Sequence, residues 1–154
     1  MWLLGFPYVR RGGKGDREAM AKSCAGFREH PVSVLNFLEG TRYTTAKHAD
    51  KQSPFTHLLP PKNGGLAFVL GELGNQIDQI VDVSIAYPSG VPSFWQFLCG
   101  DCPRVLVHTA ATAVPVAGEA RPLTEAEAGF LQHWSNERWQ HKDQWLARHK
   151  PATD

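Results

Sequence analysis

The architecture of this chain is read from one segment, VSVLNFLEGTR, at residues 32–42. Its first half, residues 32–37, follows Pro31 and is short, apolar and rich in β-prone residues, which predicts a buried strand. The predicted strand ends at a carboxylate, a glycine, a hydroxyl and a guanidinium in consecutive positions, Glu39, Gly40, Thr41 and Arg42. Because ligands bind where strands end in α/β sheets, these four residues are the first candidate for a binding site.

The residue types of this motif suit the recognition of an anion. Gly40 lets the backbone turn or approach a ligand closely, and Arg42 offers a planar fork that fits a phosphate or a carboxylate. Glu39 is placed to support that arginine. On spacing alone, an ordinary turn after a strand with a surface ion pair explains the same residues, so both interpretations stay open at this point.

Strands and helices alternate along the rest of the chain, which predicts an α/β domain. Asp16 is a suitable cap for a first helix, and Pro88 ends a β-rich run. The expected elements are a helix at 16–29, the strand at 32–37, a long loop at 43–63, a short helix at 64–73, a strand at 80–87, a β-rich stretch at 104–116 and a long C-terminal helix. Thr124 and Glu127 form a capping box that starts this last helix. Its predicted apolar stripe consists of Phe130, Leu131, Trp134, Trp145 and Leu146.

Composition limits the class of protein. The 154 residues, 42% of them hydrophobic, fit one domain at 1–154, and a formal net charge of +1 gives no reason to expect a nucleic-acid partner. The three cysteines are too few for a disulfide framework, and the pair Cys99 and Cys102 lacks the two further ligands of a zinc site, so we expect it to be structural. No stretch reaches the roughly 20 apolar residues of a membrane span.

Several motifs in order resemble those of the glycerolipid acyltransferases. The segment at 38–42 is similar to the family's substrate-binding signature, with Leu38 in place of a proline, as in the branch of bacterial inner-membrane acyltransferases and their lysocardiolipin and lysophosphatidate relatives. Four further segments resemble other parts of that branch, at residues 4–11, 52–65, 83–88 and 134–143. Most of the chain is covered. The resemblance implies a mixed sheet flanked by helices.

The resemblance also implies an activity, namely transfer of a fatty acyl group from acyl-CoA or an acyl carrier protein to the hydroxyl of a lysophospholipid such as lysophosphatidate. The donor is a substrate, and no cofactor or metal is implied. The implied substrate-binding residues are Arg10, Arg11, Glu39, Gly40, Thr41, Arg42 and Pro88. The implied location is the membrane surface, at the cytoplasmic face of an inner membrane. An apolar and basic N-terminal group is predicted to contact that surface: Trp2, Leu3, Leu4, Phe6, Arg10, Arg11 and Lys14.

One departure from the family's pattern affects catalysis. The family's base is the histidine of a His-x4-Asp motif upstream of the second motif, and the chain starts at about the second motif, so we expect the C-terminal portion of such a domain, inactive by itself. The spacing from His149 to Asp154 matches but falls in the terminal tail across Pro151, and we reject it. We expect His48 and His57 to be bystanders. The alternative function is a non-catalytic phospholipid or acyl-CoA binding module that lacks the base.

Overall fold

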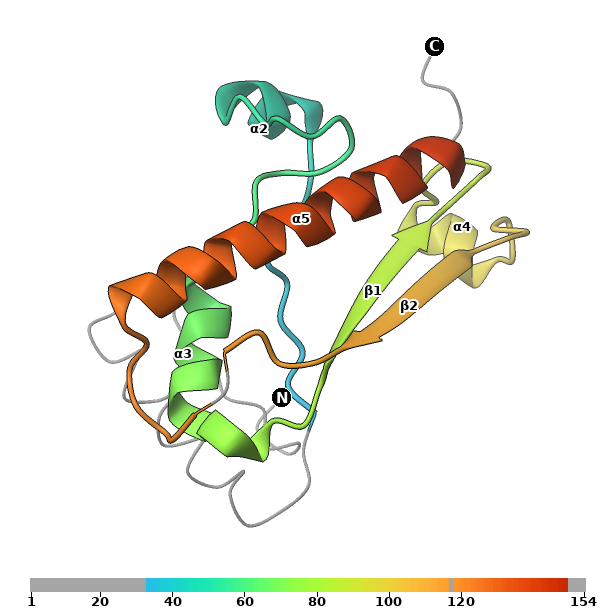
Figure 1. Cartoon of the computed structure of the whole chain (residues 1–154). Coiled ribbons are helices and arrows are strands. Elements are labelled where there is room, and N and C mark those ends of the chain that lie inside the picture. Colours follow the sequence, from blue (N-terminus) through green and yellow to red (C-terminus); the bar gives the residue numbers. More distant parts are fainter. Residues whose placement is uncertain (1–32, 117, 150–154) are drawn as a thin grey trace.

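The structure is a computed structural model and describes residues 33–116 and 118–149. Helices alternate with two strands along the chain, and a long helix ends the described part (Figure 1). The elements are α2 (Thr45–Asp50), α3 (Gly64–Leu73), the 3-10 helix η2 (Gly74–Gln76), β1 (Ile80–Ala86), α4 (Phe94–Leu98), β2 (Leu106–Thr112) and α5 (Glu125–His149). The combination of helices, sheet and long C-terminal helix confirms the predicted fold class.

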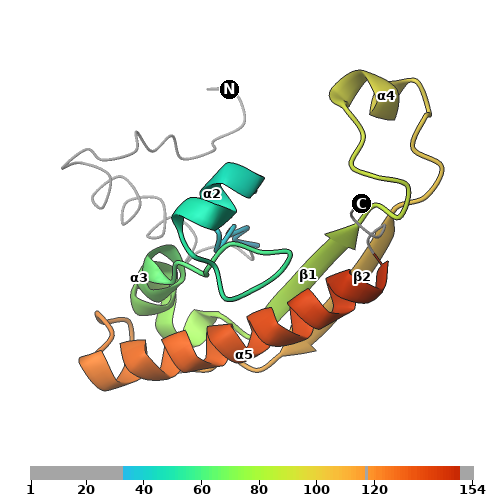
Figure 2. The same cartoon turned by 90° about the horizontal axis from the view of Figure 1, so that it is seen from above.

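β1 and β2 form an antiparallel pair whose register runs from Ile80 opposite Thr112 to Ala86 opposite Leu106. α5 crosses one face of this sheet (Figures 1 and 2). On β1 the buried residues are Ser84 and Ala86, whereas the alternating Val81, Val83 and Ile85 are exposed. This period of two is what a strand with one covered face requires.

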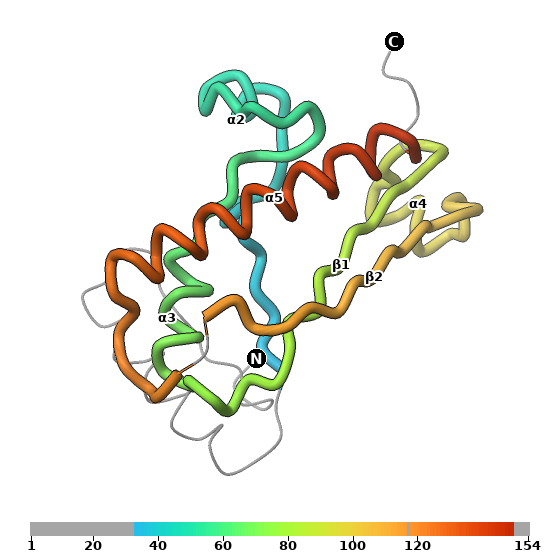
Figure 3. The backbone as a smooth tube through the Cα atoms, in the orientation of Figure 1, coloured from blue at the N-terminus to red at the C-terminus, as the bar shows by residue number. Residues whose placement is uncertain are grey.

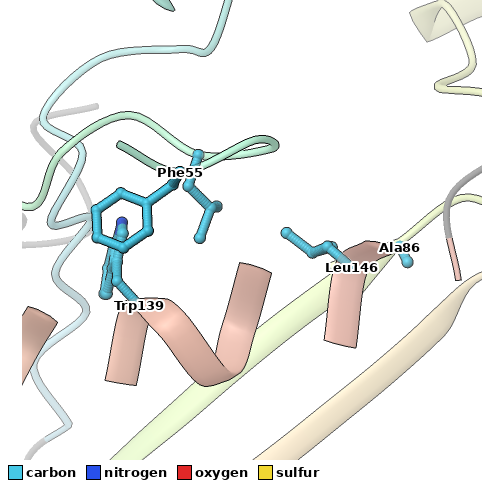
Figure 4. Close-up of a cluster of buried hydrophobic side chains, with 5 residues drawn as sticks. Phe55, Ala86, Trp139 and Leu146 are labelled. Atoms are coloured by element: carbon cyan, nitrogen blue, oxygen red, sulfur yellow. The ribbon is translucent and has the colours of Figure 1, made fainter. Parts of the chain in front are cut away.

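The main core lies between α5, the loop before α3 and the end of β1. Phe55, Leu58, Ala86, Trp139 and Leu146 form this buried cluster, drawn in Figure 4. A fully buried aromatic or leucine side chain contributes about 1.5–3 kcal/mol, so these contacts fix the loop against the helix. A second, smaller cluster joins Val69 and Leu73 inside α3.

The junction of α3 and η2 depends on a glycine. Gly74 has φ +53°, and a Cβ there would lie 2.7 Å from the amide nitrogen of Ala120 and from the carbonyl oxygen of Gly118. Only glycine adopts this conformation cheaply and leaves room for the passing backbone. The segment before α5 therefore crosses directly over the end of α3.

Local sequence signals were good guides to several elements. The capping box at the start of α5 is present, since Thr124 N–H donates to the Glu127 carboxylate (2.8 Å) and Glu127 N–H donates to Thr124 Oγ1 (3.3 Å). The predicted helix at 64–73 is α3, and the strand that ends before Pro88 is β1. The predicted helix at 16–29 lies outside the described residues.

Three expectations were wrong. Residues 33–37 form an irregular extended segment instead of a strand, because no described strand pairs with them (Figure 3). The predicted loop at 43–63 contains α2, whose first turn is capped by Thr44 Oγ1. Phe130 is 53% exposed, and the apolar stripe of α5 uses Trp139 instead, which was not assigned to it.

Candidate functional site

The Glu39–Arg42 motif begins in a tight turn that spans Phe37 to Gly40 and has a fixed backbone. Gly40 N–H donates to Phe37 O (2.9 Å), and Lys62 N–H donates to Leu38 O (2.7 Å), which ties the turn to the segment before α3. Gly40 has φ +65°, in the left-handed region where a side chain is strained. The turn that Gly40 was predicted to allow is present, and its predicted part in binding a ligand stays a prediction.

Glu39 is positioned by a chain of hydrogen bonds that reaches α5. Its Oε2 accepts from Leu59 N–H (3.4 Å), and Leu59 O in turn accepts from Trp139 Nε1–H (2.9 Å). Leu59 is fully buried, so both of its backbone groups must find partners within the protein. Glu39 is therefore fixed through Leu59 to the C-terminal helix.

Thr41 is engaged by a lysine that the sequence did not single out. Lys47 Nζ donates to Thr41 Oγ1 (2.9 Å) and to Arg42 O (3.2 Å). Lys47 lies in the first turn of α2, where its own N–H donates to Thr44 Oγ1 (3.2 Å). Threonine is a preferred N-cap residue, so Thr44 is the local signal for this helix, and the helix brings the Lys47 amine back onto the motif.

Arg42 is exposed, and its guanidinium makes no hydrogen bond or ion pair with another described residue. The predicted support of this arginine by Glu39 is therefore not formed within that part of the chain. Lys47 lies on the adjacent turn, and the aliphatic part of Lys62 lies beside Gly40. A guanidinium with its donors available, next to an ammonium, suits a bidentate contact to a phosphate or carboxylate.

The motif lines one side of a broad groove. Residues 39–43 line this open space of about 2080 Å³ together with residues of β1 and of the middle of α5. On the α5 side, Lys142 Nζ donates to Asp82 Oδ1 (2.5 Å) and to Val83 O (2.9 Å), which fastens the helix to the sheet.

The described histidines do not supply a base in this groove. His48 Nε2 lies 2.5 Å from Phe55 O, a contact that orients the ring within the loop. The backbone N–H of His57 donates to Asp143 (2.7 Å), which anchors the loop without using the imidazole. Among the ion pairs of the described residues, one joins a histidine to a carboxylate, His133 with Glu137 on α5, and both side chains are more than half exposed. Neither lines the groove.

The predicted site residues are only partly brought together. Glu39, Gly40, Thr41 and Arg42 line the groove, whereas Pro88, just beyond the end of β1, is not among its lining residues. Arg10 and Arg11 lie outside the described residues, as does the N-terminal group predicted to contact a membrane surface. Sequence reasoning missed Lys47, Leu59 and Trp139.

Within residues 33–116 and 118–149, no group of histidine, cysteine and acidic side chains is arranged to bind a metal ion. Cys99 and Cys102 carry free thiols there. None of the helices in this part is long and apolar enough to cross a membrane.

Comparison with known proteins shows relatives along nearly the whole chain. Lysocardiolipin acyltransferase 1 of Danio rerio is 30% identical, covering 96% of this chain, and its Gallus gallus counterpart is 27% identical over the same share. The 1-acyl-sn-glycerol-3-phosphate acyltransferase epsilon of Mus musculus is 24% identical, again over 96%. The chain spans 40–44% of the length of these relatives. No model of a protein family matches the chain. No solved structure matches it either.

Proposed function

Because this chain is related to the glycerolipid acyltransferases along nearly its whole length, we propose that it is part of an O-acyltransferase that acts on a lysophospholipid. The proposed donor is acyl-CoA or an acyl carrier protein, and the proposed acceptor is a lysophospholipid such as lysophosphatidate. The observation that carries the proposal is the motif at 39–42, where the Arg42 guanidinium is exposed at the edge of an open groove.

In this reaction the acceptor hydroxyl oxygen bonds to the thioester carbonyl carbon, the carbon–sulfur bond breaks, and the thiol leaves with the proton that the hydroxyl loses. Arg42 contributes by binding the acceptor phosphate with two parallel N–H donors. Lys47 keeps the arginine's backbone in place through its contact with Arg42 O. Binding the phosphate at a fixed point orients the hydroxyl, and orientation lowers the barrier by converting a bimolecular encounter into an effectively unimolecular one.

The alternative function is a non-catalytic module that binds phospholipid or acyl-CoA. One observation favours it, namely that the groove is not lined by any paired histidine and carboxylate from the described residues. A general base contributes about 10²–10⁴-fold to rate. We therefore predict that residues 1–154 bind the acceptor but consume thioester slowly.

We propose that the protein works at a membrane surface, on the cytoplasmic face of an inner membrane, because its proposed acceptor is a membrane lipid. The apolar and basic residues near the N-terminus are the proposed contacts.

The test of the proposed site is the Arg42→Ala variant. We expect the dissociation constant for glycerol 3-phosphate and for lysophosphatidate, measured by titration calorimetry on residues 1–154, to rise by about 10- to 150-fold, which corresponds to the roughly 1.5–3 kcal/mol of a charge-assisted hydrogen bond. Arg42→Lys should restore binding only in part, because an ammonium cannot reproduce the bidentate fork.

The control is Arg148→Ala, which removes an exposed arginine from the last turn of α5 outside the groove. It should leave both dissociation constants within twofold. Equal losses in the two variants would indicate a general charge effect, and unchanged binding in Arg42→Ala would rule out the motif as the phosphate site. Thioester consumption with lysophosphatidate as acceptor then separates the acyltransferase from the binding module.

A further inference from the structure

Lys47 carries a charge that no carboxylate of the described residues neutralises. Its Nζ donates to two uncharged oxygens, Thr41 Oγ1 (2.9 Å) and Arg42 O (3.2 Å), and it takes part in none of the ion pairs of that part of the chain. Asp50 lies three residues further along α2, at a spacing that permits an ion pair, yet it does not pair with Lys47. The half-buried amine and the exposed guanidinium of Arg42 therefore concentrate positive charge at this turn. An anion bound there would offset the repulsion between them.

The contact with Lys47 gives the Thr41 hydroxyl a defined direction as a donor. A hydroxyl has one proton and two lone pairs, whereas an ammonium has donors only. Because Thr41 Oγ1 accepts from Lys47, the Thr41 proton must point away from the amine, and no described residue offers it an acceptor. A hydroxyl that accepts a bond from a cation is also polarised, which strengthens the hydrogen bond that it donates. Thr41 therefore retains one unused and strengthened donor.

The lysine lies behind this donor, on the side away from the groove. Thr41 and Arg42 are among the residues that line the groove, and Lys47 is not. A ligand in the groove therefore meets the Thr41 hydroxyl and the Arg42 guanidinium on consecutive residues, and the bond from Lys47 to Arg42 O fixes the main chain there. A phosphate monoester presents three terminal oxygens, one more than the two that a guanidinium fork binds. The Thr41 hydroxyl is the donor available for the third oxygen.

We propose that Thr41 donates its hydroxyl proton to the acceptor phosphate, and that Lys47 is the positioning residue that directs this donor. The inference rests on the proposed function, because it takes the anion bound by Arg42 to be the phosphate of the acceptor. It gives Thr41 a defined contact with the ligand and gives α2 a role in the site, since this helix brings the amine to the back of Thr41.

The experiment is a double-mutant cycle on residues 1–154, in which titration calorimetry measures the dissociation constant for glycerol 3-phosphate. Thr41→Val removes the hydroxyl and keeps the shape of the side chain, so it should raise the constant by about 3- to 10-fold, the effect of one net hydrogen bond. Lys47→Met should raise it by a similar factor. Because the lysine acts through the threonine, the double variant should bind within about twofold of the weaker single variant. Thr41→Ser keeps the hydroxyl and should bind like the wild type.

The matched control is Lys51→Met, which removes the same charge from the C-terminal end of α2, at a residue that does not line the groove. It should leave the dissociation constant unchanged. Equal losses in Lys47→Met and Lys51→Met would overturn the proposal, because net charge would then explain both. Losses that multiply in the double variant would also overturn it, because Lys47 would then act without Thr41. If Lys47→Met loosens α2, the comparison of Thr41→Val with Thr41→Ser still decides, and equal binding by these two variants refutes the hydroxyl contact.

The Arg42→Ala variant separates this inference from the proposed function. If Arg42→Ala weakens binding and Thr41→Val does not, the inference fails and the proposed phosphate site stands. If glycerol 3-phosphate does not bind the wild type, both fail. Binding that depends on the Thr41 hydroxyl, without any thioester consumption, would refute acyl transfer by this chain and support the contact proposed here.

Discussion

Trp139→Phe should destabilise the protein and loosen the motif at 39–42 together. Trp139 is 6% exposed, and its indole N–H donates to Leu59 O (2.9 Å) inside the core. Phenylalanine fills most of the same space but has no donor, so the Leu59 carbonyl is left buried without this partner. An orphaned buried acceptor costs about 1–3 kcal/mol. The lost part of the indole adds about 1 kcal/mol, a fraction of the roughly 3–5 kcal/mol of a Trp→Ala change.

The expected loss in the free energy of unfolding is therefore about 2–4 kcal/mol, a large share of the roughly 5–15 kcal/mol that keeps a domain folded. Urea unfolding followed by circular dichroism measures it, with the slope checked for two-state behaviour. Because Leu59 N–H donates to Glu39, we also expect faster hydrogen exchange at the Leu59 amide.

Trp134→Phe is the matched control. Trp134 is half-buried on α5, and its indole nitrogen has no hydrogen-bond partner among the described residues, while Arg138 lies over its ring at 5.8 Å. Its loss should cost less than about 1 kcal/mol. The reasoning is refuted if Trp139→Phe stays within about 0.5 kcal/mol of the wild type, or if the two variants cost the same.

Two further predictions concern the α3 junction and the start of α5. Gly74→Ala should lower the unfolding midpoint in urea, because φ +53° and a Cβ contact of 2.7 Å with the Ala120 amide nitrogen are both unfavourable. The control is Gly129→Ala, in open space on α5, which should raise the free energy of unfolding by about 0.4–1 kcal/mol. An unchanged midpoint in Gly74→Ala would contradict the close approach of the two backbones. The Arg121 hydrogen bond first, and the Thr124 cap after it, lower the pKa of Glu127 from 4.5 to about 2. This carboxylate therefore stabilises the fold above pH 4.5 and loses that effect as pH falls towards 2. Glu127→Gln should flatten the plot of unfolding free energy against pH in this range. If the plots of the wild type and of Glu127→Gln run parallel, the lowered pKa of Glu127 is contradicted.

Elements that carry local signals were predictable from the sequence. The capping box of Thr124 with Glu127 sets the start of α5, and the proline that follows β1 sets the end of that strand. Both signals act within a few residues, so they do not depend on tertiary contacts. The segment at 33–37 has the composition of a strand. A strand, however, is defined by a neighbour that pairs with its backbone, and composition does not supply one.

The residue types of the site could be predicted from the sequence, but the hydrogen bonds that hold these residues in place could not. The motif at 39–42 was identified from the chemistry of consecutive residues, and it does form a turn at a groove. The contact of Trp139 with Leu59 spans 80 positions, so no local pattern signals it. The hydrogen bond from Lys47 Nζ to Thr41 Oγ1 depends on α2, a helix of six residues within a segment that was expected to be a loop.

The hydrogen bonds around the motif show that its neighbouring side chains have different roles. Glu39 bonds inward to Leu59, Thr41 is engaged by Lys47, and Gly40 supplies the turn, so each of the three is used to build the structure. Arg42 differs from them, because its backbone carbonyl is bound while its guanidinium has no partner among the described residues. A cation whose main chain is fixed and whose donors remain available loses less freedom when an anion binds. For this reason Arg42 is the residue of the motif whose substitution should affect binding without affecting the stability of the fold.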